Sequence, residues 1–178
     1  MIPTLGIDIG RVIIAAANSS GGDTSFLSAE HEQALLTPAS PGAFKAIREL
    51  NDVFDGRVWL VSKAGQKIQA RSRAWLTRSR FWDLTGVPSD HIRFCRERHE
   101  KAAHCVRLGV THFVDDRSDV LRTMEGIVPC LYLFGPQPSR ARLLGMTPVI
   151  NWSAARAAIL RDRPSGWETP ETEMGQHP

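Results

Sequence analysis

Side chains that together could transfer a phosphoryl group stand at the ends of apolar segments or at the start of a helical one. Asp8 follows the first apolar segment, Ser62 ends another, and the pair Asp115 and Asp116 ends a third. Lys101 opens a helical pattern just before that third segment. A carboxylate nucleophile, a hydroxyl, an ammonium and a carboxylate pair are the groups that transfer through an aspartyl-phosphate needs.

These side chains need elements that bring them together. Apolar segments of strand length alternate with helical patterns, which is typical of an α/β domain with a parallel sheet. We expect strands near residues 4–9, 57–62, 91–95, 111–115 and 129–134, and a weaker one near 147–150. Ligands collect at the carboxyl ends of the strands in such sheets. We therefore expect Asp8, Ser62 and Asp115 to meet at one crevice, with Lys101 entering from the helix before the fourth strand.

Apolar residues at helical spacing predict the helices that cover the sheet. In the first of them, Phe44, Ile47 and Leu50 recur on one face, which we expect to pack on the sheet. We expect Ser153 to cap the last one. The predicted helices lie near residues 41–54, 66–81, 100–108, 118–124 and 153–160.

A chain of 178 residues fits one domain, which we place at residues 1–160. Residues 15–40 are largely small and polar and interrupt the connection between the first strand and the first helix, so we expect a short flap or insert. Residues 161–178, which include Trp167, contain several prolines and glycines and no apolar period. We expect this tail to be disordered.

Composition is ordinary for a soluble globular protein, with 42% hydrophobic and 23% charged residues. No apolar run approaches the ~20 residues that cross a bilayer, and the N-terminal residues lack the pattern of a signal peptide. We expect a cytoplasmic protein without a membrane partner. Cys95, Cys105 and Cys130 are widely spaced and form no Cys-x-x-Cys pair, which favours structural thiols over a metal or redox site.

The net charge of +3 is small but unevenly distributed. A stretch of basic residues predicts a local positive field that attracts anions. Trp75, Phe81 and Trp82 lie within it, and basic and aromatic side chains together suit nucleic acid. We favour instead a buried Trp75 and a solvated basic surface. The basic residues are Lys63, Lys67, Arg71, Arg73, Arg78, Arg80, Arg93, Arg96, Arg98 and Lys101.

In order and spacing, the candidate site residues resemble the haloacid-dehalogenase (HAD) superfamily of phosphohydrolases. The resemblance covers roughly residues 4–135 and implies a Rossmann-like three-layer fold around a parallel sheet. The segment Gly-Val-Thr-His-Phe-Val-Asp-Asp-Arg is similar to the 5′-nucleotidase-like branch. The four superfamily motifs match Ile7-Asp8-Ile9-Gly10, Leu60-Val61-Ser62, Lys101 and Val114-Asp115-Asp116.

The resemblance implies catalytic roles for three of these residues. Asp8 would be the nucleophile, and Ser62 would donate a hydrogen bond to a phosphoryl oxygen, helped by the backbone N–H of Lys63. Lys101 would neutralise the nucleophile and the phosphate together. The implied ligand is a phosphorylated small molecule or nucleotide.

The resemblance also implies a Mg²⁺ ion, which prefers carboxylate oxygens and retained water. Asp8 and Asp115 would bind it directly, with the backbone carbonyl of Gly10 as a third ligand. Asp116 would bind through water or orient the lysine, and Asp119 would assist.

Gly10 departs from the family pattern, because HAD phosphatases carry an acid/base aspartate at this position. General acid–base catalysis contributes about 10²- to 10⁴-fold, or roughly 3 to 5 kcal/mol of barrier. Superfamily branches without this aspartate that cleave carbon–halogen or phosphonate bonds have a large cap with a substrate lysine, which residues 15–40 do not provide. Two hypotheses remain: a weak or atypical Mg²⁺-dependent phosphohydrolase, and a catalytically silent domain that binds a phosphorylated ligand or a protein partner.

Overall fold

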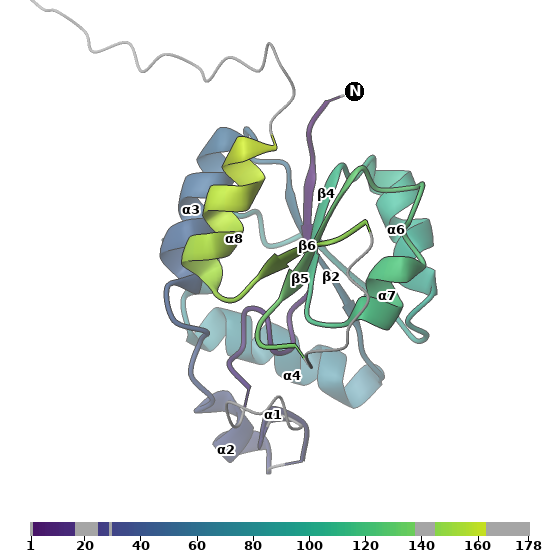
Figure 1. Ribbon diagram of the computed structural model, residues 1–178. Coiled ribbons are helices and arrows are strands. Elements are labelled where there is room, and N and C mark those ends of the chain that lie inside the picture. Colours follow the sequence, from purple (N-terminus) through teal and green to yellow (C-terminus); the bar gives the residue numbers. More distant parts are fainter. Residues whose placement is uncertain (1, 17–24, 29, 138–144, 163–178) are drawn as a thin grey trace, which may run out of the picture.

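Six parallel strands form one sheet between two layers of helices in the computed structural model (Figure 1). The structure describes residues 2–16, 25–28, 30–137 and 145–162. The strand order is β3-β2-β1-β4-β5-β6. This arrangement confirms the predicted α/β, Rossmann-like three-layer fold. The strands are β1 (Leu5–Ile7), β2 (Val58–Lys63), β3 (Ile92–Cys95), β4 (His112–Asp115), β5 (Cys130–Phe134) and β6 (Thr147–Val149).

Helices α3 and α8 cover one face of the sheet, and α6 and α7 cover the other (Figure 1). The predicted helix over 66–81 is wrong at its end, because Arg80 has a left-handed backbone with φ 57° that does not continue a helix. The helices after the insert are α3 (Ala43–Val53), α4 (Gln66–Arg78), α5 (Phe81–Thr85), α6 (Glu100–Leu108), α7 (Ser118–Arg122) and α8 (Trp152–Arg161).

The cap of α8 also differs from the expectation. The side chain of Asn151 accepts a hydrogen bond from the N–H of Ala154 at 2.9 Å, so Asn151 is the N-cap and Ser153 lies inside the helix. The helix continues through Arg161, one residue into the expected tail. Asp162 accepts a hydrogen bond from the Tyr132 hydroxyl at 3.0 Å. The rest of the expected tail, including Trp167, lies outside the described residues.

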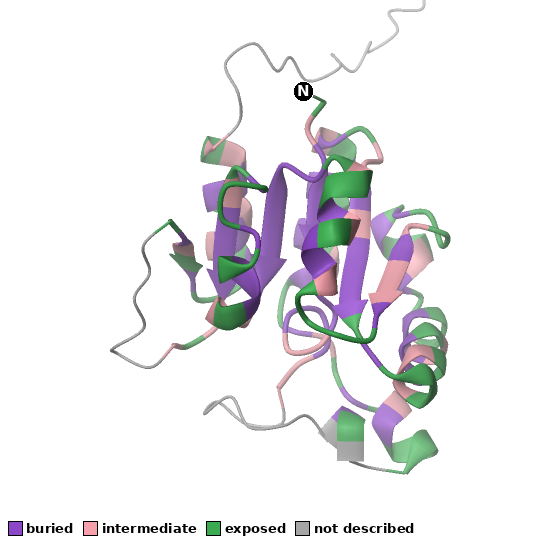
Figure 2. Ribbon diagram, turned by 90° about the vertical axis from the view of Figure 1, so that its right-hand side faces the viewer, coloured by how far each residue is buried: buried purple, intermediate pink, exposed green. Residues whose placement is uncertain are grey.

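The central strands β1, β4 and β5 are almost entirely buried, whereas the edge strands β3 and β6 and the outer sides of the helices are partly exposed (Figure 2). One apolar cluster lies between the sheet and α3, α4 and α8, and a second lies between the sheet and α6 and α7. Trp75 is buried in the first cluster and donates to the Thr37 carbonyl at 2.7 Å. Trp152 is buried there too and donates to the Val12 carbonyl at 2.9 Å, which fixes the loop after β1.

The insert contains two short helices that the small, polar residues of 15–40 did not predict, α1 (Ser25–Ser28) and α2 (His31–Leu35). Residues 17–24 and 29 of this segment lie outside the described residues. Figure 1 places α1 and α2 beyond the carboxyl ends of the strands. The buried Arg71 of α4 donates to the carbonyl of Phe26 at 2.6 Å and to that of Leu27 at 3.3 Å. Helix α4 therefore holds the insert over this edge of the sheet.

None of the helices in the described ranges is both long and apolar enough to cross a membrane.

Candidate functional site

Asp8, Gly10, Ser62, Lys101 and Asp116 line one pocket at the carboxyl edge of β1, β2 and β4, whereas the fully buried Asp115 does not line it and contacts it through Lys101. Ile7 pairs with Leu60 of β2 and with Val114 of β4, so the residues that follow lie in one row across three adjacent strands. The N–H of Asp8 donates to the Val114 carbonyl at 2.9 Å and continues the pairing by one residue. The pocket encloses about 260 Å³.

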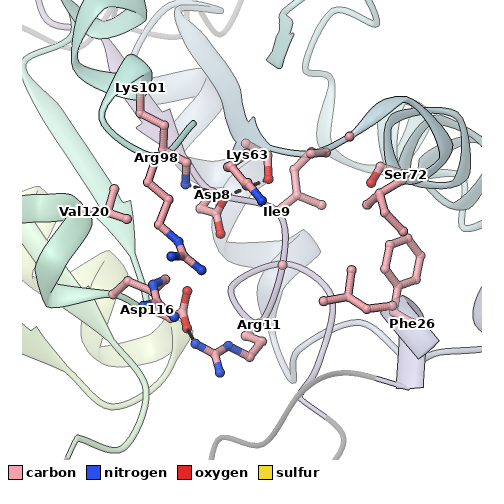
Figure 3. A pocket seen from close by; sticks show the side chains of 17 residues that line it. Asp8, Ile9, Arg11, Phe26, Lys63, Ser72, Arg98, Lys101, Asp116 and Val120 are labelled. Atoms are coloured by element: carbon pink, nitrogen blue, oxygen red, sulfur yellow. Dashed lines mark hydrogen bonds and ion pairs between the residues drawn. The ribbon is translucent and has the colours of Figure 1, made fainter. Parts of the chain in front are cut away.

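Lys101 lies at the centre of this row. Its ammonium donates to Asp8 Oδ1 at 2.8 Å and to Asp115 Oδ2 at 2.7 Å, and its side chain is only 3% exposed. Ser62 donates to the same Asp8 oxygen at 2.8 Å. Figure 3 shows Lys101 next to Asp8 on one side of the pocket. The structure therefore brings Asp8, Ser62, Lys101 and Asp115 together.

A close contact between β1 and β4 lies beneath the lysine. A side chain at Gly6 of β1 would overlap the ring of Phe113, which pairs with it on β4. The Lys101 ammonium lies 5.9 Å from the centre of the Phe113 ring. Because Gly6 lacks a side chain, the aromatic ring can lie across β1 under the lysine.

Burial and charge act on these groups in opposite directions. Burial alone lowers the pKa of the Lys101 ammonium, but Asp115 and Asp8 together outweigh burial and keep this pKa above its ordinary value. Burial raises the pKa of the fully buried Asp115 carboxyl, although Lys101 opposes the shift. One ammonium thus faces two carboxylates, of which Asp115 is fully buried and Asp8 is 10% exposed, and this excess of negative charge favours a further cation or proton at the site.

Asp116 adds a third carboxylate. Oxygen atoms of Asp8, Asp115 and Asp116 all lie within 4.8 Å of one another. Burial raises the pKa of Asp116, and the guanidinium of Arg11, which forms an ion pair with it, opposes that shift. The lysine's hydrogen bonds go to Asp8 and Asp115, so Asp116 is oriented by Arg11, which was not among the predicted site residues.

Gly10 lines the pocket two residues after Asp8. A Cβ atom added at this position would meet nothing within 4 Å, so the pocket has room for a side chain here. The following residue, Arg11, has a positive φ of 59°. The loop is closed by hydrogen bonds from the N–H groups of Ile13 and Ile14 to the Ile9 carbonyl, both at 3.0 Å.

Asp119 does not contact the other carboxylates. Its two oxygens bind the guanidinium of Arg117 at 3.0 Å each, and it is absent from the pocket lining. The backbone N–H of Arg117 donates to Asp115 Oδ1 at 2.9 Å. Asp119 therefore affects the site through Arg117 rather than as a direct ligand.

The remaining lining combines cations with an apolar wall. Phe26 and Leu27 of the insert contribute the wall together with Ile68, and none of the three was predicted to lie at the site. Arg11 and Arg117 also line the pocket without having been predicted to do so. The only sequence signal for them is that they directly follow Gly10 and Asp116. Among the residues that the structure describes, five cationic side chains line the pocket: Arg11, Lys63, Arg98, Lys101 and Arg117.

Several residues of the basic and aromatic stretch are not on the surface. Trp75, Phe81 and Arg71 are buried, so they cannot stack on an incoming base. Burial raises the pKa of Cys105 to about 12 and that of Cys95 to about 11, and both remain thiols at neutral pH.

No protein-family model matches the chain, and a search of curated proteins found no significant match. The geometry of the pocket therefore carries the functional argument.

Proposed function

We propose that this protein is a HAD-like, Mg²⁺-dependent phosphohydrolase that acts on a phosphorylated metabolite or nucleotide through an aspartyl-phosphate. One observation carries the proposal. The Lys101 ammonium contacts Asp8 and Asp115 at 2.8 and 2.7 Å, while Ser62 donates to the Asp8 oxygen that the lysine also binds. This arrangement fixes one carboxylate oxygen by two donors and leaves the other to react.

The free oxygen is Oδ2 of Asp8, which receives no hydrogen bond from the residues that the structure describes and points into the pocket in Figure 3. It would form a bond to phosphorus while the bond between phosphorus and the ester oxygen breaks. The ester oxygen keeps the electron pair and takes a proton from water. A second water then hydrolyses the aspartyl-phosphate, releasing inorganic phosphate and restoring the Asp8 carboxylate.

The carboxylates fit a magnesium ion in type and number. Asp8, Asp115 and Asp116 offer oxygens within 4.8 Å of one another, and Mg²⁺ binds few carboxylates and keeps several waters. Asp8 and Asp115 would bind the ion directly with the Gly10 carbonyl, and Asp116 through water. The ion would supply positive charge that offsets the repulsion between a carboxylate and a phosphoryl group.

Gly10 limits the rate that we expect. With no acid at this position, an alkoxide leaving group departs without a proton from the protein, and ordinary alkyl phosphates should turn over slowly. The second candidate, a silent domain that binds a phosphorylated ligand or a protein partner, is favoured by the same residue and by the Arg11–Asp116 ion pair. In that ion pair, the Asp116 carboxylate, which would otherwise help to hold the metal, is bound to Arg11.

A phosphate-ester panel in millimolar Mg²⁺ distinguishes the two candidates, with Asp8→Asn as the blank. We expect slow release of phosphate by the wild-type protein, fastest from p-nitrophenyl phosphate, and none above background by the variant. Equal rates for the two proteins, together with tight binding of inorganic phosphate, would favour the silent domain.

The metal is tested separately by thermal unfolding. Millimolar Mg²⁺ should raise the melting temperature of the wild-type protein, because a ligand that binds only the native state stabilises it. Asp115→Asn should remove this increase. If Asp115→Asn and Asp8→Asn both keep the full response to Mg²⁺, the assigned metal site is wrong.

A further inference from the structure

Two cations of the pocket have no part in the proposed reaction. Within the described part of the chain, neither the Lys63 ammonium nor the Arg98 guanidinium has a side-chain hydrogen bond or an ion pair, and both line the pocket. Both side chains extend into it in Figure 3, with the guanidinium between Asp8 and Asp116 in that view.

Local structure places these two cations beside the groups that would hold the phosphoryl. Lys63 directly follows Ser62 at the end of β2. Arg98 lies three residues before Lys101, in a loop that Glu100 closes by accepting hydrogen bonds from the N–H groups of Arg96 at 2.9 Å and Glu97 at 3.0 Å. The Arg98 carbonyl accepts from the Lys101 N–H at 3.2 Å. The loop before α6 therefore presents Arg98 to the pocket.

The charges of the other lining cations are already matched by neighbouring carboxylates. Arg11 pairs with Asp116, Arg117 binds Asp119, and Lys101 lies between two aspartates. In the proposed reaction, Lys101 and Ser62 bind the transferred phosphoryl group, so Lys63 and Arg98 are not needed for it. Lys63 and Arg98 thus add positive charge next to the reacting group.

We infer that the substrate carries a second anionic group, a carboxylate or a further phosphate, which Lys63 and Arg98 bind. This inference rests on the proposed function, because it places the transferred phosphoryl at Asp8. The apolar wall of Phe26, Leu27 and Ile68 contacts the carbon skeleton between the two anionic groups. Arg98 is then a specificity-determining residue, since a planar guanidinium binds carboxylate and phosphate in a bidentate manner.

Calorimetry on Asp8→Asn protein tests the inference without turnover. The probes are inorganic phosphate and two matched series in Mg²⁺ buffer: alkyl phosphates, and carboxyalkyl phosphates of the same chain lengths, beginning with ethyl phosphate and phosphoglycolate. For the chain length that fits, we expect the carboxylate to tighten binding about tenfold, the effect of one charge-assisted hydrogen bond. Adding Arg98→Gln should abolish this preference and leave the affinity for the alkyl phosphate within about twofold.

Arg96→Gln is the matched control, because it removes the same charge from the same loop at a residue outside the pocket lining. It should keep the preference. Equal binding of both series at every chain length, with phosphate still bound, overturns the inference and leaves the proposed function standing. Equal weakening of both series by Arg98→Gln also overturns it, because Arg98 would then hold the transferred phosphoryl. Failure of both the Asp8→Asn and the wild-type protein to bind inorganic phosphate in Mg²⁺ buffer overturns the proposed function, and the inference with it.

Discussion

Gly10 is the residue at which the chemistry of this pocket can be changed most directly. It lies two residues after Asp8, and a Cβ atom added to it meets nothing within 4 Å. In the proposed reaction, a carboxylic acid at this position would have the role of the family's acid/base aspartate, which protonates the leaving group. The pocket thus has the room for an acid but not the acid itself.

Gly10→Asp should therefore raise turnover, and more for an alkyl phosphate than for p-nitrophenyl phosphate. An alkoxide gains much from protonation, whereas nitrophenolate leaves well without it. We expect an increase in kcat/KM of about tenfold or more for the alkyl ester, within the usual range of general acid catalysis. Steady-state kinetics on both esters measures the ratio.

Gly10→Asn is the control, since asparagine is about the size of aspartate but has no acidic proton to donate to the leaving group. A Gly10→Asp protein that folds, binds Mg²⁺ and turns over neither ester would favour the silent binding domain. Fast turnover of alkyl phosphates by the wild-type protein would contradict the role given to Gly10, because another group would then supply the proton.

At the scale of elements, β4 carries a titratable group at each end. Asp115 ends the strand at the pocket, and His112 begins it at the opposite edge, buried against Phe54 and Tyr132. Burial lowers the pKa of His112, whose ring also contacts the Thr111 hydroxyl at 2.8 Å. The folded protein therefore binds a proton at His112 less readily than the unfolded chain does.

The lowered pKa predicts a loss of stability in mild acid. Above the ordinary pKa of about 6.5, His112 is neutral in both states and its titration has no effect. Below it, the unfolded chain takes up a proton that the folded chain refuses, so the free energy of unfolding falls as pH decreases, by at most about 1.4 kcal/mol per pH unit. Urea unfolding between pH 5 and 8 should show this slope.

His112→Phe keeps an aromatic ring at the start of β4 and removes the titration. Its unfolding free energy should vary less with pH below 6.5 than that of the wild-type protein. Other titrating groups, including Asp115, contribute equally to both proteins and cancel in the difference. Parallel pH profiles would show that His112 binds its proton equally well in the folded and unfolded states.

The sequence predicted each of the six strands because apolar segments with polar ends mark buried parallel strands. It also predicted the meeting of Asp8, Ser62, Lys101 and Asp115, since residues at the carboxyl ends of neighbouring strands share one edge. Helices α1 and α2 are too short and polar to give a periodic pattern. The break before α5 was missed because Arg80 adopts positive φ without the glycine that usually indicates it.

Other parts of the site depend on contacts between distant segments. Arg71 holds the insert by donating hydrogen bonds to the backbone carbonyls of Phe26 and Leu27. Because every residue has a backbone carbonyl, the residue types do not reveal this contact. The basic stretch predicted a positive field, but Arg71 of that stretch is buried while Arg98 reaches the pocket. The number of basic residues in a stretch of sequence does not show which arginines are buried in the fold and which line a pocket.

At the scale of the whole molecule, cations from several elements surround one opening. Lys63 comes from β2, Arg98 from the loop before α6, and Arg11 from the loop after β1. Together with a net charge of +3, they favour the approach of anions. Exposed charges are screened by salt, whereas the buried Lys101 is screened much less.

We therefore expect the affinity for inorganic phosphate to fall several-fold when the ionic strength rises from about 0.05 to 0.5 M, because the screening length shortens below the width of such a site. Calorimetry across a NaCl series measures the slope. The double variant Lys63→Gln/Arg98→Gln should flatten it. Lys45→Gln, an exposed charge on α3 outside the pocket lining, should leave it nearly unchanged. An identical salt dependence in all three proteins would exclude a contribution from the pocket cations.

The position of Lys101 has a consequence for the history of this chain. Because its ammonium balances two buried carboxylates, loss of the lysine would damage the fold whether or not the pocket acts on a substrate. Selection for a stable fold would therefore retain Lys101 both in an active enzyme and in a descendant that has lost catalysis. Ser62, which contributes one neutral hydrogen bond to Asp8, is under no such constraint. Among natural variants of this protein, persistence of the serine would be the better record of selection for binding a phosphoryl group.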